Sequence, residues 1–186
     1  MVERVGIISW LQRRAEHDAE ERASAMDGFD DGFGVVVEVV GPEGTRMVRI
    51  ETDGRRVSDL VNHADKLAVE AVPDDGSPAE IGLQALDLDD ALILVPPPQP
   101  TDPRHRLHRP GHPVRIVVGP YEVVGDAHSP PGTQAVGFLL RSWPRFVALT
   151  GASLRLTSDP GSSRRVPVAI VNLAQAELLR EVVVEG

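Results

Sequence analysis

The sequence contains no cysteine, and this absence excludes several kinds of chemistry at once. Disulfides, thiolate nucleophiles and zinc or iron–sulfur sites held by cysteine cannot form. Aromatic residues make up 4% of the chain, so a core has to be built from Val, Leu, Ile and Ala. Glycine and proline are abundant, with 17 and 16 residues, which favours many short elements joined by turns over a helix bundle.

Long hydrophobic runs are also missing. No apolar stretch approaches the roughly 20 residues that a membrane-spanning helix needs. The apolar stretch at residues 5–11 has Glu3 in front of it, Ser9 inside it and Arg13 and Arg14 behind it. It lacks the length and the small-residue cleavage site of a signal peptide. We therefore expect a soluble, cytoplasmic protein.

Charge is divided unevenly along the chain. Residues 1–103 hold 9 Lys/Arg and 22 Asp/Glu, a balance of -13, whereas residues 104–186 hold 10 and 6, a balance of +4. Together these give the net charge of -9. The two parts can be separately solvated surfaces, or the acidic part of one molecule can meet the basic part of another. So acidic a chain does not favour nucleic-acid binding.

One short pattern occurs twice. Residues 36–42 read VVEVVGP and residues 114–120 read VRIVVGP, 78 positions later (114 minus 36). The same shift aligns residues 57–62 with residues 135–140, and a shift of 79 aligns residues 67–72 with residues 146–151. Self-similarity that persists over three segments is typical of a duplicated module. Under this alignment, Val39 corresponds to Val117.

The fold that we predict is mainly β with minor α. It has an N-terminal amphipathic helix and two related β-barrel-like or β-sandwich modules, an internal duplication packed about a pseudo-twofold axis. The predicted segments are residues 1–32 (helix and acidic linker), 33–95 (first module), 96–112 (proline-rich and basic linker) and 113–186 (second module). The last module should contain a helical segment at residues 173–180 and a strand at 182–184. Trp143 and Phe146 should join the aliphatic core.

The N-terminal segment has the pattern of a helix. Ser9 and Gln12 form a capping-box pattern, and no Gly or Pro lies between Ser9 and Gly28. Its apolar stripe is narrow and largely alanine after Leu11. The stripe can cover an end of its own module or dock on a partner. In the second case Ile8, Trp10, Leu11 and Ala15 are the candidate partner-binding residues.

A dense basic cluster follows the proline-rich linker. Residues 104–112 read RHRLHRPGH, and their three histidines could in principle bind a metal ion. The three interleaved arginines would repel a cation, so we expect no metal site. An exposed basic loop is one interpretation. The other is an anion site, because Arg and His suit phosphate or carboxylate, with Arg104, Arg106, His108, Arg109 and Arg115 as candidate ligands.

Two segments carry a resemblance to a known family. Residues 56–62 (RVSDLVN) and residues 146–152 (FVALTGA) resemble the two halves of a signature found in an uncharacterised bacterial family of small β-rich domains. In that family an Arg-aliphatic-Ser-Asp-Leu-Leu-Asn segment leads into a Phe-aliphatic-Ala-Leu-Thr strand. The resemblance implies β-rich modules in this chain. It implies no activity, since none is known for the family.

Signatures of catalysis are missing from the sequence. It has no GxSxG, HExxH, Walker or GxGxxG motif and no evident acid–base pair. We therefore expect a non-catalytic protein without a cofactor, whose leading function is to assemble or adapt other protein subunits. It would do so through its N-terminal helix and its oppositely charged halves. The alternative is a ligand-sensing module that binds a nucleotide or phosphorylated metabolite at residues 104–115.

Overall fold

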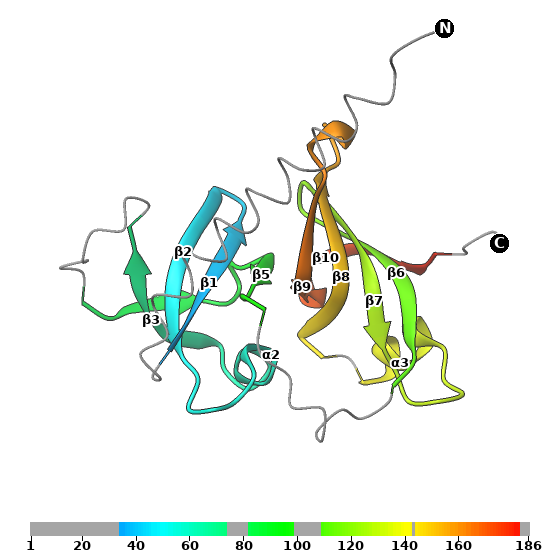
Figure 1. Cartoon of the computed structure of the whole chain (residues 1–186), viewed down its shortest axis with the longest axis horizontal. Helices are drawn as coiled ribbons and strands as arrows, with labels where there is room; N and C mark the ends of the chain where they lie inside the picture. Colours follow the sequence, from blue (N-terminus) through cyan, green and yellow to red (C-terminus); the bar gives the residue numbers. More distant parts are fainter. Residues whose placement is uncertain (1–33, 74–81, 99–108, 143, 183–186) are drawn as a thin grey trace, which may run out of the picture. The chain divides into compact units, whose positions relative to one another are not determined.

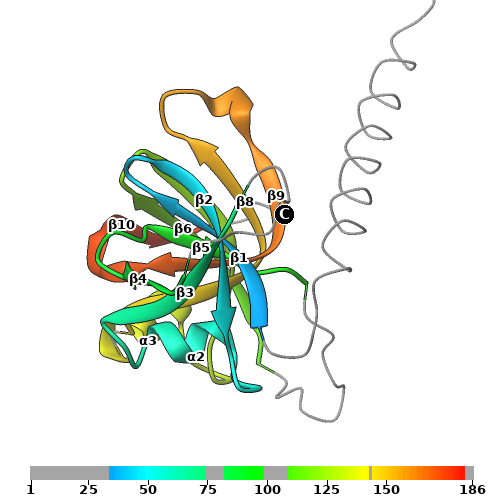
Figure 2. The ribbon, with the colours of Figure 1, turned by 90° about the vertical axis from the view of Figure 1, so that its left-hand side faces the viewer.

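A computed structural model describes residues 34–73, 82–98, 109–142 and 144–182 of the chain. Ten antiparallel strands form one sheet, in the order β10-β6-β7-β8-β9-β5-β1-β2-β3-β4 (Figures 1 and 2). The prediction of a mainly β fold with minor helix is confirmed. The predicted β-barrel-like or β-sandwich modules are not shown as such: described strands from both parts of the chain pair in one sheet, and that sheet is not closed.

The first half of the sheet lies before the proline-rich segment. Its elements are β1 (Gly34–Gly41), β2 (Gly44–Glu51), α2 (Val57–Val61), β3 (Lys66–Val72), β4 (Gln84–Asp87) and β5 (Ile93–Val95). The second half consists of β6 (Gly111–Val118), β7 (Tyr121–His128), α3 (Ala135–Ser142), β8 (Phe146–Leu156), η2 (Pro160–Ser162), β9 (Arg164–Asn172), η3 (Leu173–Gln175) and β10 (Ala176–Glu181).

The two halves share one strand order. The first half runs β5-β1-β2-β3-β4 and the second runs β10-β6-β7-β8-β9, so in each half the fifth strand pairs with the first. In each half a short helix follows the second strand, and both helices lie on the lower side of Figures 1 and 2. These helices are α2 in the first half and α3 in the second.

The register of the hairpins corrects the predicted alignment by one residue. Gly41 pairs with Gly44, whereas Val118 pairs with Tyr121, so the two-residue turns are residues 42–43 and 119–120. The shift is therefore 77 (119 minus 42), not 78. Val39, 2% exposed, corresponds to Ile116, which is fully buried. Residue 117 is partly exposed, because a slip of one residue turns a side chain to the other face.

Matching hydrogen bonds fix a second correspondence. The Leu88 N–H donates to the Asp65 carbonyl at 3.0 Å, and the Leu173 N–H donates to the Arg145 carbonyl at 2.7 Å. Asp87 Oδ1 accepts from the backbone N–H two residues on at 3.0 Å, and Asn172 Oδ1 does so at 3.1 Å. Leu173 and Asn172 lie 85 positions after Leu88 and Asp87 (172 minus 87), and this shift relates β4 to β9 and β5 to β10. Arg145, directly before β8, lies 80 positions after Asp65, directly before β3 (145 minus 65).

The halves join through unlike strands. Ile93 pairs with Val171 and Leu94 with Ile170, so β5 of the first half lies beside β9 of the second. A closed twofold arrangement would also pair their counterparts, β10 and β4. Among the described strands that pair is not made, and β10 and β4 are the two ends of the sheet.

The core forms two clusters, and each takes side chains from across the β5–β9 junction. Val40, Leu92 and Ile93 belong to the first half but pack in the second-half cluster. Phe146 and Ile170 belong to the second half but pack in the first-half cluster. Phe146 is 1% exposed, as the sequence predicts for a core residue. The other predicted aromatic core residue, at position 143, lies outside the described residues.

The C-terminal segment differs from the prediction. In place of a helix over residues 173–180, the turn η3 leads into β10, which pairs with β6. Most of the strand predicted over residues 182–184 lies outside the described residues. The residues of β10 have good intrinsic helix propensity, but pairing with an open strand overrides it. The second half also begins earlier than predicted, because β6 starts at Gly111, inside the expected linker of residues 96–112.

Candidate functional site

Among the described strands, the two at the ends of the sheet, β4 and β10, present unpaired backbone. In β4 the Leu88–Asp65 hydrogen bond sets the alternation, so the N–H and C=O of Ala85 point away from β3. In β10 the Val182 N–H donates to the Pro113 carbonyl at 2.9 Å, so the backbone groups of Leu179 point away from β6. Free strand edges of this kind are templates for pairing with another strand.

Exposed leucines mark both free edges. Leu83, directly before β4, is 68% exposed, and Leu178 in β10 is 40% exposed. They are two of the three large hydrophobic side chains that are exposed among the described residues, and the third is Leu140 in α3. An exposed apolar side chain beside unpaired strand backbone favours pairing of that edge with another strand.

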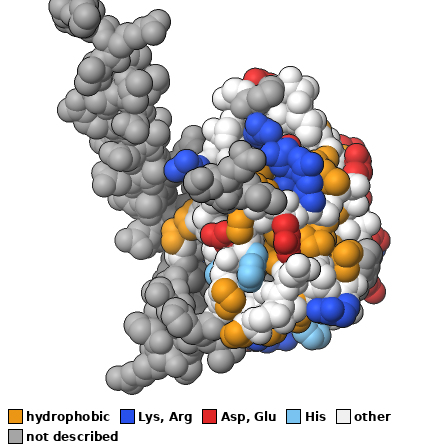
Figure 3. All heavy atoms as spheres, turned by 90° about the vertical axis from the view of Figure 1, so that its right-hand side faces the viewer, with side chains coloured by type: hydrophobic (Ala, Val, Ile, Leu, Met, Phe, Trp, Pro, Cys, Tyr) orange, Lys and Arg blue, Asp and Glu red, His pale blue; other side chains and the backbone are white. Residues whose placement is uncertain are grey.

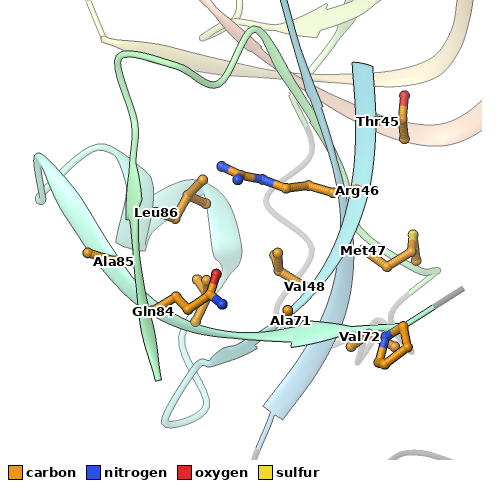
Figure 4. A pocket seen from close by; sticks show the side chains of 11 residues that line it. Thr45, Arg46, Met47, Val48, Ala71, Val72, Gln84, Ala85 and Leu86 are labelled. Carbon is orange, nitrogen blue, oxygen red and sulfur yellow. The ribbon is translucent and has the colours of Figure 1, made fainter. Parts of the chain in front are cut away.

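A pocket of about 240 Å³ lies beside the β4 edge, between β2, β3 and β4 (Figure 4). Val48, Val69 and Leu86 supply its apolar lining and are at most 4% exposed. Arg46 extends from β2 across the pocket toward Leu86. Within the described part of the chain Arg46 has no ion-pair partner. By the shift of 77 it occupies the position that Val123 holds in the second-half core.

The equivalent pocket of the second half is filled. Val40 and Ile93 reach into it from the first half and are 1% and 0% exposed. Their counterparts in the second half are Val117 and Leu178, which pair across β6 and β10 on the outer face. One half therefore has an occupied pocket, and the other has an open pocket with the matching apolar groups on the far end of the sheet.

Polar contacts hold the β5–β9 junction together. Arg164 in β9 donates two hydrogen bonds to Glu38 in β1, at 2.8 and 2.5 Å. Asn62, after α2, donates to the Phe146 carbonyl at 2.9 Å and accepts from the Phe146 N–H at 2.8 Å. Asn172 is fully buried and donates to first-half carbonyls. The junction is thus a complete interface, with paired strands, shared cores and satisfied polar groups.

A basic surface covers the outer face of the second half. Glu122 in β7 lies between two arginines, 3.4 Å from Arg115 in β6 and 2.6 Å from Arg155 in β8. Arg180 in β10 lies directly opposite Arg115. Figure 3 shows this side of the molecule, with Lys and Arg side chains gathered in its upper part. The arrangement leaves positive charge beyond what Glu122 neutralises.

The sequence-predicted residues are placed only in part. Arg115 lies in this basic surface. Arg109 is exposed just before β6, and its carbonyl lies 3.2 Å from Nδ1 of His128, whose Nε2 lies 2.8 Å from the Thr150 hydroxyl. The structure does not bring Arg109 and Arg115 into any common contact. The other candidates lie outside the described residues: Arg104, Arg106, His108, Ile8, Trp10, Leu11 and Ala15.

One ion pair stands at the β4 edge. Lys66 lies 3.0 Å from Asp87. The backbone N–H of Asp89 and the ammonium group of Lys66 lower the pKa of the Asp87 carboxyl. The hydrogen bond to Asp87 and its charge raise the pKa of Lys66. Asp87 therefore stays ionised at neutral pH and places a negative charge at the β4 edge.

Sequence reasoning missed the free edges and the pocket. Strand order decides which strand is left unpaired, and order follows from long-range pairing that local patterns do not contain. Leu83 and Leu178 stand close to other apolar residues in the sequence, so no local pattern distinguishes them as exposed. They are weak evidence by themselves, since single exposed apolar side chains are normal.

No family model, curated protein or solved structure was found to match the chain. In the described residues no group of three or more His, Asp or Glu side chains could hold a metal ion. None of the described helices has both the length and the apolar character needed to cross a bilayer.

Proposed function

We propose that this chain is a non-catalytic assembly or adaptor protein that binds protein subunits. The observation that carries the proposal is the pair of free edges, β4 and β10, each with an exposed leucine beside unpaired backbone. Both are features by which strands recruit other strands. The N-terminal helix and the opposite charges of the two halves remain part of the proposal as further contacts.

We also propose that the two halves derive from one duplicated module. Their shared strand order, the matching helix positions and the paired hydrogen bonds at Asp87 and Asn172 support this origin. A duplicated module that joins its copy through unlike strands already contains the geometry for adding further modules. Duplication therefore supports the assembly function rather than an enzymatic one.

Two measurements test the proposed function. Light scattering of the full chain over a range of protein and salt concentrations should show self-association. A pull-down with the full chain as bait should retain protein partners that a doubly edge-blocked variant, Ala85→Pro with Leu178→Lys, does not retain. A chain that stays monomeric throughout and retains nothing beyond this variant would refute the assembly function.

A second candidate is the sensing of a small anion, which the basic surface at Arg115, Arg155 and Arg180 favours. Glu122 already binds two of these arginines, so an anion has to displace it, and we place this candidate second. Thermal-shift measurements with nucleotides and phosphorylated metabolites test it, because a bound ligand raises the stability of the folded state. Arg115→Ala should remove such a shift, and Arg141→Ala, on α3, is the control.

A further inference from the structure

We infer that the chain associates with copies of itself head to tail, by pairing β10 of one copy antiparallel with β4 of the next. The contact would repeat between molecules the β5–β9 junction that joins the two halves within one molecule. This inference rests on the proposed assembly function and names the partner as a second copy of this chain.

The backbone groups at the two edges already have the register of the junction. Within the chain, Leu94 in β5 pairs with Ile170 in β9. Subtracting 85 from Ile170 gives Ala85, and adding 85 to Leu94 gives Leu179. Ala85 and Leu179 are residues whose N–H and C=O point out of the sheet. The same pair of hydrogen bonds can therefore form between two copies.

Apolar side chains match on the face of the sheet that carries the open pocket. In the junction, Val40 and Ile93 fill the second-half core. Their counterparts Val117 and Leu178 lie together on the outer face, and Leu178 is 40% exposed. The open pocket beside β4 corresponds to the space that Val40 and Ile93 fill. Leu178 of one copy would enter this pocket in the next.

On the opposite face of the sheet, the β4 edge also carries an exposed apolar side chain that a second copy would cover. Val168 in β9 packs against the first-half core across the junction. Its counterpart is Leu83 (168 minus 85), which is 68% exposed because none of the described strands lies beyond β4. An exposed leucine therefore stands where the internal junction buries a valine. Pairing with β10 of a second copy would cover it.

Charge distinguishes the contact between copies from the junction inside the chain. Leu92 and Val123 are both members of the second-half core. Their counterparts are Glu177 in β10 and Arg46 in the pocket, so two apolar residues of one core inside the chain correspond to two residues of opposite charge between copies. The net charges of the two halves also favour this contact, since the acidic half of one copy would meet the basic half of the next.

Because β4 and β10 are different strands, the contact is heterologous. Each copy has one acceptor edge, β4, and one donor edge, β10. Association therefore does not stop at two copies and leads to a ring or an open chain. Pairing of β4 with β4, or of β10 with β10, would instead stop at a dimer. This difference makes the inference testable with single-edge variants.

The experiment uses sedimentation velocity on full-length protein with two variants. Leu178→Lys disables the donor edge, and Ala85→Pro removes an outward N–H from the acceptor edge without touching the pairing with β3. The association constant of each variant alone should be lower than that of wild type by a factor of about ten or more. A mixture of the two should form a 1:1 complex and nothing larger, because one intact donor meets one intact acceptor. Leu178→Met and Ala85→Val are the matched controls and should associate like wild type.

A charge exchange gives a second test that does not depend on proline at the edge. Arg46→Glu alone and Glu177→Arg alone should each weaken association, and the two together in one chain should restore it. Wild-type protein that is monomeric at every concentration would overturn the head-to-tail contact. Association that persists in both single-edge variants would also overturn it, while leaving the assembly function in place. The pull-down described above decides that function separately.

Discussion

Replacing Asn172 with alanine removes three hydrogen bonds from the interior of the sheet. Its Nδ2 donates to the carbonyls of Leu88 and Ala91, at 3.2 and 2.9 Å, and its Oδ1 accepts from the Ala174 N–H at 3.1 Å. Asn172, Leu88 and Ala91 are all fully buried. The alanine variant therefore leaves two carbonyl groups without a donor in a place that water does not reach.

The expected loss can be built from its parts. An unsatisfied buried polar group costs about 1–3 kcal/mol, and loss of a capping side chain costs about 1 kcal/mol. Because the two carbonyls share one amide donor, we expect a decrease in the free energy of unfolding of about 3–4 kcal/mol. With a urea m-value of about 2 kcal/mol/M, the midpoint should fall by about 1.5–2 M.

Urea titration followed by circular dichroism measures this loss, and Asp87→Ala is the matched control. Asp87 makes the same cap in the first half but lies partly exposed, so water can replace its contacts. Its alanine variant should lose much less stability. Asn172→Asp should be at least as unstable as Asn172→Ala, because a carboxylate cannot donate to the two carbonyls. Equal losses for Asn172→Ala and Asp87→Ala would refute the reasoning.

Three further predictions concern the junction, a turn and the response to acid. Glu38→Gln and Arg164→Met should each destabilise the fold by about 0.5–1 kcal/mol, and a double-mutant cycle should give a coupling below about 1 kcal/mol, since their contact is bidentate but exposed to solvent on the Arg164 side. Gly119→Ala should lower the melting temperature more than Gly132→Ala: both have positive φ, but a Cβ at Gly119 would lie 2.9 Å from a leucine methyl carbon, whereas that at Gly132 meets open space. The lowered pKa of Asp87 means that its contribution is present above the carboxyl's unfolded pKa and is lost as pH falls through the folded one. Wild type should therefore lose more melting temperature than Asp87→Asn between neutral pH and about pH 3, and identical pH profiles would contradict this.

Local patterns predicted the elements of the sheet better than their alignment. The repeated Gly-Pro pair aligned the two hairpins, but Gly41 ends a strand whereas Gly119 lies inside the turn. Aligning the two Gly-Pro pairs therefore displaces one hairpin by one residue relative to the other. Val39, which is buried, is then matched to Val117 on the opposite face of the sheet, whereas its structural counterpart is Ile116. Only strand register distinguishes these roles, and register depends on the partner strand.

Long-range order lies beyond what the sequence reveals. The segment that forms β10 has the composition of a helix. It becomes a strand because it pairs with the open side of β6, which lies more than 50 positions earlier in the sequence (for example, Leu179 pairs with Ile116). The free edges that form the candidate site follow from that order. Arg115 was identified as a charged candidate, whereas its neighbours Glu122 and Arg155 were not, because they come together only when β6, β7 and β8 pair.

The β5–β9 junction also bears on the order in which the chain folds as it is made. Ile93 leaves the ribosome 78 residues before its partner Val171 (171 minus 93). During that interval Val40 and Ile93 have no second-half core to enter, so the newly made first half presents an apolar edge to the surrounding proteins. Closing a contact over so long a stretch of chain is slow compared with forming the hairpins. The arrival of β9 therefore ends the period in which a nascent chain is most exposed to aggregation.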